Sequence, residues 1–63
     1  MPEDCNENGV PRSRIAELAV GDEILIGPDF YATITVVHDG KFDIVNEHGR
    51  PMRINPAAIW ALP

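Results

Sequence analysis

The sequence has little of what small proteins use to reinforce a fold. It holds one cysteine in 63 residues, so no disulfide can form within the chain, and a lone thiol suits a reducing compartment. No apolar run approaches the ~20 residues of a membrane-spanning helix, and the N-terminus lacks the basic and apolar regions of a signal peptide. We therefore expect a cytoplasmic protein that makes no membrane contact.

Positive charge is also scarce. Five Lys and Arg against ten Asp and Glu give a net charge of −5, which opposes loose binding to nucleic acid. Nine of the ten acids lie in residues 1–45, whereas residues 46–63 hold two arginines and a histidine beside a single acid. These residues, Arg50, Arg53 and His48, predict a locally basic end of the fold. The alternative is a solvated hairpin tip.

The chain is too short for more than one domain. A domain of this size buries only about 60% of the surface of its unfolded chain, and its stability is only ~3–9 kcal/mol. Structural zinc needs four clustered ligands, and His38, His48 and Cys5 are not grouped, so we expect no metal and no cofactor. Self-association is the remaining reinforcement, and we expect a homodimer.

The N-terminus differs in composition from the rest. Residues 1–13 are polar and acidic, with two prolines and a glycine, and are predicted to be a disordered tail. Residues 14–63 form the single domain. At its start, residues 14–20 fit both helical spacing and strand alternation, so helix and strand both stay open.

Beyond Gly21 the pattern has a period of two. Apolar and β-branched residues predict strands over residues 23–26, 31–38, 41–46 and 51–54. Ala32, Ile34 and Val36 are expected on one face of the second strand. Asp-Gly at residues 39–40 is a strong signal for a hairpin.

The C-terminal segment should end the fold with a short helix. Asn55 can cap it and Pro56 suits its first position, which predicts one or two helical turns within residues 55–62. Ile59 and Trp60 are expected to pack on the sheet or on another subunit. The whole is predicted to be all-β: a small antiparallel barrel of four to five strands, SH3-like, with a short C-terminal helical turn.

Catalytic groups are hard to assemble. The hydroxyls of Thr33 and Thr35 fit strand propensity, Asp39 fits a turn, and Asp43 fits a solvent-facing position. We therefore predict no catalytic residues and no enzyme activity. Among the aromatic residues, Phe42 and Trp60 are assigned to the core, which leaves Phe30 and Tyr31 as exposed contacts. They lie beside Asp29.

The stretch from Val20 to Asp29, "VGDEILIGPD", followed by "TITVV" and "PMRINPAAIW", resembles the carbon storage regulator family over roughly residues 15–60. The resemblance implies an intertwined homodimer of five-stranded chains that binds messenger RNA leaders and regulates translation. The family's basic stretch before the glycine corresponds here to residues 16–19, Ala-Glu-Leu-Ala. Its arginine before the last helix corresponds to Pro56.

Two other functions remain open. One is an SH3-like module that binds another protein without RNA. The other follows from "GDEI" and "MRINPAAI", which resemble the type II dihydrofolate reductases, although Arg53 and Asn55 replace that family's pore-lining residues. The candidate contact residues, whether for RNA or for a protein partner, are Arg50, Arg53, His48, Arg14 and Tyr31.

Overall fold

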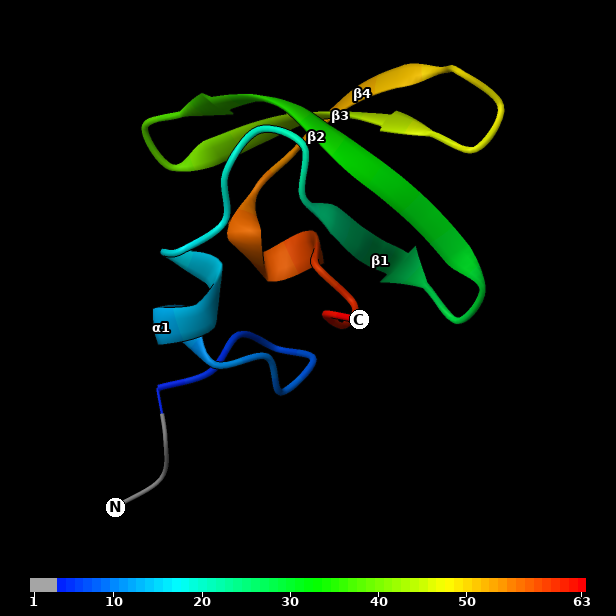
Figure 1. The fold of residues 1–63 in the computed structure, drawn as a ribbon. Coiled ribbons are helices and arrows are strands. Elements are labelled where there is room, and N and C mark those ends of the chain that lie inside the picture. Colours follow the sequence, from blue (N-terminus) through cyan, green and yellow to red (C-terminus); the bar gives the residue numbers. More distant parts are fainter. Residues whose placement is uncertain (1–3) are drawn as a thin grey trace.

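The computed structural model describes residues 4–63, and its main feature is one four-stranded antiparallel sheet (Figure 1). The strands are β1 (Glu23–Gly27), β2 (Phe30–His38), β3 (Lys41–Asn46) and β4 (Pro51–Ile54). Each strand pairs with the next along the chain. A single helical turn, α1 (Arg12–Ile15), precedes the sheet, and a 3-10 turn, η1 (Pro56–Ala58), follows it. The all-β prediction and its four strands are confirmed.

The β2–β3 hairpin forms where Asp39 and Gly40 were expected to turn the chain. His38 pairs with Lys41 across it. Gly40 has a φ of +82°, a conformation that glycine adopts without steric cost. The dipeptide therefore sets the register of the two longest strands, and the hairpin prediction is confirmed.

The alternation of buried and exposed residues in β2 stops at Thr35. Ile34 pairs with Ile44, but Val36 pairs with Asp43, so Thr35 is an extra residue in a β-bulge. The bulge shifts the alternation by one residue, which puts Val36 on the exposed face, 42% exposed. The prediction that Val36 shares the face of Ile34 is therefore wrong.

The core lies between the concave face of the sheet and the segments that flank it. Four isoleucines are essentially inaccessible to solvent, and each contributes about 1.5–3 kcal/mol on burial. The buried apolar residues are Val10, Ile15, Ile24, Ala32, Ile34, Phe42, Ile44 and Ile59. Ile15 comes from α1 and Ile59 from the chain after η1, so both flanking segments are held by the sheet.

The sheet is not closed into a barrel. β1 and β4 lie at opposite ends of the strand order. After η1 the chain returns to β1 and forms a single bridge, between Leu25 and Ala61. The Leu25 N–H donates to the Ala61 carbonyl at 3.0 Å. Because β1 does not pair with β4 and shares only one bridge with the returning segment, the predicted barrel is corrected to an open sheet.

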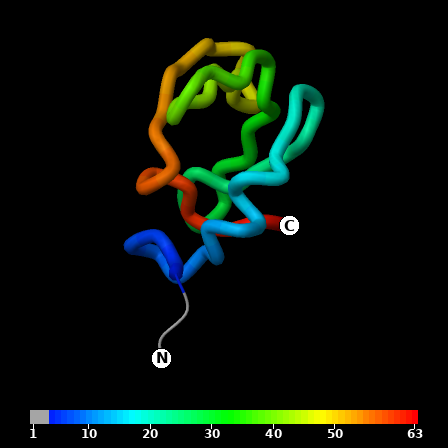
Figure 2. The backbone as a smooth tube through the Cα atoms, turned by 90° about the vertical axis from the view of Figure 1, so that its left-hand side faces the viewer, coloured from blue at the N-terminus to red at the C-terminus, as the bar shows by residue number. Residues whose placement is uncertain are grey.

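The two segments with helical signals form single turns. Residues 14–19, left open between helix and strand, contain the end of α1 and the turns that follow it. After β4 only the 3-10 turn η1 forms, and no side-chain bond from Asn55 caps it, so the predicted capping is wrong. η1 turns the chain back beneath the sheet (Figure 2).

The N-terminal segment is folded over residues 4–13, which corrects the predicted tail for those residues. Residues 1–3 lie outside the described residues. Cys5 and Pro11 form an antiparallel bridge, and Val10 is buried in the core. The turn lies beside the C-terminal segment in both views (Figures 1 and 2). Asn6 is the buried polar residue that holds the two segments together.

Asn6 uses its whole side-chain amide. Its Nδ2 donates to the carbonyl oxygens of Pro56 and Ile59, each at 2.9 Å. Its Oδ1 accepts from the N–H groups of Asn8 and Val10, each also at 2.9 Å. A polar side chain with only 7% exposure is stable in such a position because every donor and acceptor has a partner.

Candidate interaction surfaces

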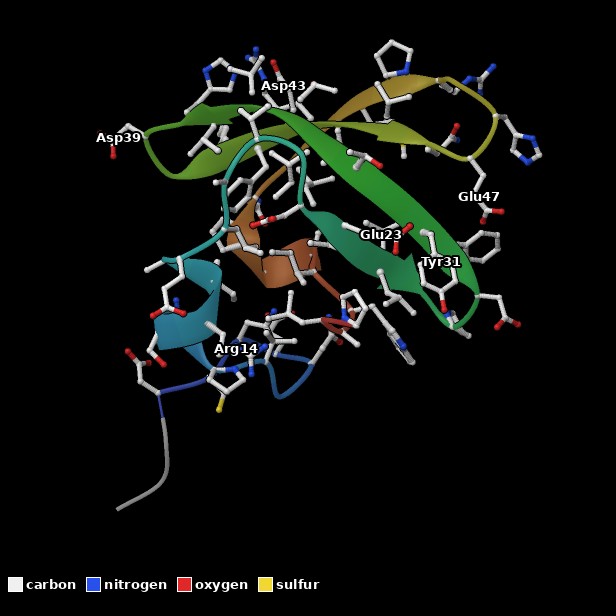
Figure 3. All side chains as sticks on the ribbon, in the orientation of Figure 1. Arg14, Glu23, Tyr31, Asp39, Asp43 and Glu47 are labelled. Atoms are coloured by element: carbon white, nitrogen blue, oxygen red, sulfur yellow. The ribbon has the colours of Figure 1, made fainter. Side chains whose placement is uncertain are left out.

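The five predicted contact residues lie in four different elements. Tyr31 is the second residue of β2, His48 and Arg50 lie in the β3–β4 turn, Arg53 lies in β4, and Arg14 lies on α1. Figure 3 shows Tyr31 and Arg14 on different parts of the molecule. The structure thus brings His48 and Arg50 into one turn, and it separates Arg14 from the other four.

Arg53 belongs to a charged cluster on the exposed face of the sheet. Arg53 pairs with Asp43 across β3 and β4, and its Nε donates to Asp43 Oδ1 at 2.8 Å. His38 Nε2 lies 2.8 Å from Asp43 Oδ2. The carboxylate therefore lies between two nitrogen donors from the strands on either side. Sequence analysis had placed Asp43 on this face, but it had not paired it with Arg53.

The cluster lowers the pKa of its central carboxyl group, that of Asp43. The hydrogen bond from Arg53, followed by that from His38, lowers the pKa of Asp43 from 3.8 to about 2. The same bond raises the pKa of Arg53. Because the Arg53 charge is balanced by Asp43, it is a poor candidate for binding a phosphate. The pairing could have been found by folding the sequence about the Gly49 turn.

The β3–β4 turn carries the two remaining basic side chains of this end. The Asn46 Oδ1 accepts from the N–H groups of His48 and Arg50, each at 2.9 Å, which fixes the backbone of the turn. Both His48 and Arg50 are exposed. The turn thus exposes the side chains of His48 and Arg50 beside Glu47, and Arg53 lies outside it in β4.

Tyr31 lies among carboxylates. Tyr31 is 41% exposed, and its backbone N–H donates to Glu47 Oε1 at 3.4 Å. On the other side Leu25 pairs with Tyr31, and Glu23 pairs with Thr33, so Glu23 is a diagonal neighbour on the same face. Figure 3 shows Glu23, Tyr31 and Glu47 at one end of the sheet.

Two further aromatic side chains are exposed. Phe30 is 62% exposed and Trp60 44% exposed, so the prediction that Trp60 is a core residue is wrong. Ile59 takes the buried position instead. Three of the four aromatic residues of the chain are thus exposed, and only Phe42 is in the core.

Backbone pairing places the exposed aromatic residues on adjoining segments. The Trp60 N–H donates to the Leu25 carbonyl at 2.8 Å, and Leu25 pairs with Tyr31 on its other side. Phe30 leans over Gly27, where a Cβ would lie 2.5 Å from its ring, so this approach requires glycine. We refer to Phe30, Tyr31 and Trp60 as the aromatic surface.

A groove of about 310 Å³ lies between α1 and the β2–β3 hairpin. Its apolar floor includes Ile15 and Phe42, and its polar lining includes Arg12 and His38. Arg12 is paired with Asp4 at 2.9 Å, and His38 is paired with Asp43. Both side chains are thereby engaged with carboxylates of the same chain, which leaves the groove without a strong recognition group for a charged ligand.

Within residues 4–63 no three His, Cys, Asp or Glu side chains gather closely enough to hold a metal ion. No helix in the same part of the chain is long and apolar enough to cross a membrane. Comparison with protein-family models, curated proteins and solved structures found no match to this chain. Function must therefore be inferred from the surfaces themselves.

Proposed function

We propose that this protein is a small non-catalytic binding module, and that the aromatic surface binds a basic segment of another protein. The observation that carries the proposal is the exposure of three of the four aromatic side chains. Large apolar side chains exposed together typically mark interaction sites, and aromatic residues are enriched there.

The order of the elements supports an SH3-like module. A four-stranded meander, a 3-10 turn and a return of the chain to β1 follow one another in that order. SH3-like barrels have this order, with the returning segment as a fifth strand. Such a scaffold presents its strand ends and turns to a partner, and here the aromatic surface lies beside the β1–β2 turn.

The charge around Tyr31 favours a cationic partner. Glu23 and Glu47 flank it on the two neighbouring strands, and Asp29 lies in the adjacent turn. A lysine or arginine of the partner placed over the Tyr31 ring would be attracted by the ring, through a cation–π interaction, and also by the nearby carboxylates. The net charge of −5 steers basic partners toward the protein at long range.

Titration calorimetry with a lysine- and arginine-containing peptide tests the proposal. The Tyr31→Ala variant should bind with about 1 kcal/mol less free energy, which is roughly fivefold in Kd. Val36→Ala is the matched control, since Val36 is as exposed and lies on the same strand, but opposite Asp43 and not between Glu23 and Glu47. A peptide with glutamates in place of the basic residues should not bind. Equal affinity of both peptides, or of both variants, would contradict the proposal.

An RNA-binding translational regulator like the carbon storage regulators is the second candidate. The observation in its favour is the exposed pair His48 and Arg50 in the β3–β4 turn. Against it, Arg53 is paired with Asp43, and residues 12–15 form a helical turn in place of the strand that this family would begin with.

Fluorescence anisotropy with a GGA-containing RNA hairpin and a scrambled hairpin distinguishes the two candidates. We expect no sequence-dependent binding at physiological salt. Binding that prefers the GGA hairpin and is lost in Arg50→Ala, but kept in Tyr31→Ala, would replace the first candidate with the second. Sedimentation adds a further test, because that family's function requires the intertwined homodimer: a single-chain mass at micromolar concentration would exclude it.

A further inference from the structure

The N-terminal turn contains a chemically reactive dipeptide. Of the four asparagines in the chain, only Asn8 precedes a glycine. Asparagine is among the least chemically stable residues in proteins, and a following glycine leaves the neighbouring backbone nitrogen unobstructed. A Cβ placed on Gly9 would find nothing within 4 Å, so the dipeptide also has open space around it.

We propose that Asn8 is a deamidation site whose reaction is gated by the N-terminal turn, and that the reaction releases this turn from the C-terminal segment. The Gly9 backbone nitrogen loses its proton and attacks Asn8 Cγ. The Cγ–Nδ2 bond breaks, and ammonia leaves with the proton, which gives a cyclic imide. Water then opens the imide at either carbonyl and produces aspartate or isoaspartate at position 8. No oxidant or reductant is needed.

The fold holds both reacting groups away from this reaction. The Gly9 N–H donates to the Asn6 carbonyl at 3.1 Å. Asn8 Nδ2 donates to the Ile59 carbonyl at 2.9 Å and to the Ala57 carbonyl at 3.4 Å. All three bonds must break before the nitrogen can reach Cγ. The reaction rate therefore depends on how often the turn opens locally.

Deamidation replaces the attractive contact between Asn8 and the Ile59 carbonyl with a repulsive one. A carboxylate is acceptor-only, so the bond from Nδ2 to Ile59 is lost and two oxygens face each other. The isoaspartate product also adds a carbon to the backbone of the turn. Asn8 lines a groove with Trp60 and Leu62, so the released turn changes the surroundings of the only tryptophan.

The experiment follows deamidation of the full chain in mildly alkaline buffer by peptide mass mapping. The rate at Asn8 is compared in native buffer and in urea. Two variants accompany it: Asn6→Ala, which removes the bonds that hold the turn, and Asn8→Gln, which keeps the amide donor but cyclises far more slowly. The peptide that contains Asp39-Gly40 serves as an internal reference for chemical changes that arise while the peptides are prepared. Trp60 fluorescence and hydrogen exchange at Val10 report release of the turn.

We expect Asn8 to react at least several times faster in urea than in native buffer, with Asn6→Ala close to the urea rate. Exchange at Val10 should rise as the product accumulates, and Asn8→Gln should show neither change. Equal rates with and without urea would overturn the gating. Deamidation that leaves exchange at Val10 unchanged would overturn the release. If Asn6→Ala is unfolded, the comparison of the wild-type chain in buffer and urea still decides the gating.

Discussion

Two turns in this protein share the pattern Asn-Glu-x-Gly, at residues 6–9 and 46–49. In both, the asparagine Oδ1 accepts from the N–H groups two and four residues later, at 2.9 Å. In both, the glycine N–H donates to the asparagine carbonyl, and the glycine φ is positive, at +85° and +80°. The same local sequence therefore forms the same backbone twice.

The surroundings of the two turns differ. The turn at 46–49 joins β3 to β4, and Asn46 accepts bonds from within the turn itself. The turn at 6–9 is not part of the sheet, and Asn6 Nδ2 donates to the chain around η1. Asn6 is buried, whereas Asn46 is only partly covered. An identical motif thus closes a hairpin in one place and joins the two ends of the chain in the other.

Each turn is flanked by one Asp–Arg ion pair, with the aspartate before the turn and the arginine after it. Asp4 and Arg12 enclose the first at 2.9 Å, and both side chains are well exposed. Asp43 and Arg53 enclose the second at 2.8 Å, where Asp43 is 28% exposed and has a second partner in His38. Exposed pairs contribute little to stability, so we expect the second pair to matter more than the first.

The largest expected effect comes from removing the buried asparagine. Asn6→Ala should lower the free energy of unfolding by about 3 kcal/mol, since more than one buried backbone group loses its partner at roughly 1–3 kcal/mol each. Urea unfolding followed by circular dichroism measures it. Asn46→Ala is the matched control, with an expected loss of about 0.5–1.5 kcal/mol because water can replace its bonds. Similar losses in both variants would show that burial does not distinguish the two turns.

A smaller and equal effect is expected from the two turn glycines. Gly9→Ala and Gly49→Ala should each cost about 1–2 kcal/mol, because alanine is strained at positive φ. No atom lies within 4 Å of a Cβ at either position, so strain alone should act. Thermal melts of the two variants provide the comparison. A cost at one position and none at the other would mean that the two backbones are not equivalent in solution.

The smallest effect concerns pH. The pKa of Asp43 is about 2 in the folded protein, against an ordinary value of 3.8, so its stabilising contribution is present above pH ~4 and is lost as the pH falls toward 2. In Asp43→Asn the stability should fall less steeply over this range than in the wild type. Asp4→Asn, which alters the exposed pair, should leave the slope unchanged. Parallel slopes for the wild type and Asp43→Asn would contradict the assignment.

The sheet could be predicted from the sequence because its signals are local. Alternation of apolar residues and the Asp39-Gly40 turn were enough to place four strands and a hairpin. The bulge at Thr35 could not be predicted, since an extra residue breaks no propensity rule and is decided by the pairing of β2 with β3. The face of Val36 was therefore assigned wrongly.

The candidate surfaces were predicted less completely. Tyr31 and Phe30 were recognised as exposed, but Trp60 was placed in the core because aromatic residues usually pack there. The neutralisation of Arg53 required the cross-strand register of β3 and β4, which composition does not contain. The first turn was missed because the acidic and polar composition of residues 1–13 predicted a disordered tail, and the pattern that it shares with the second turn was not recognised.

The sequence by itself determined the strands, the hairpin at Asp39-Gly40 and the two Asn-Glu-x-Gly turns, because propensity and φ preference act over a few residues. The tertiary structure alone decided which asparagine is buried, which arginine keeps an unbalanced charge and where the chain ends meet. The burial of Asn6 and the meeting of the chain ends depend on contacts between residues 50 positions apart, as in the bond from Asn6 to Pro56. The balanced charge of Arg53 depends on its cross-strand contact with Asp43, 10 positions away. Local propensity contains no information on such contacts, because they depend on how the folded chain places both partners.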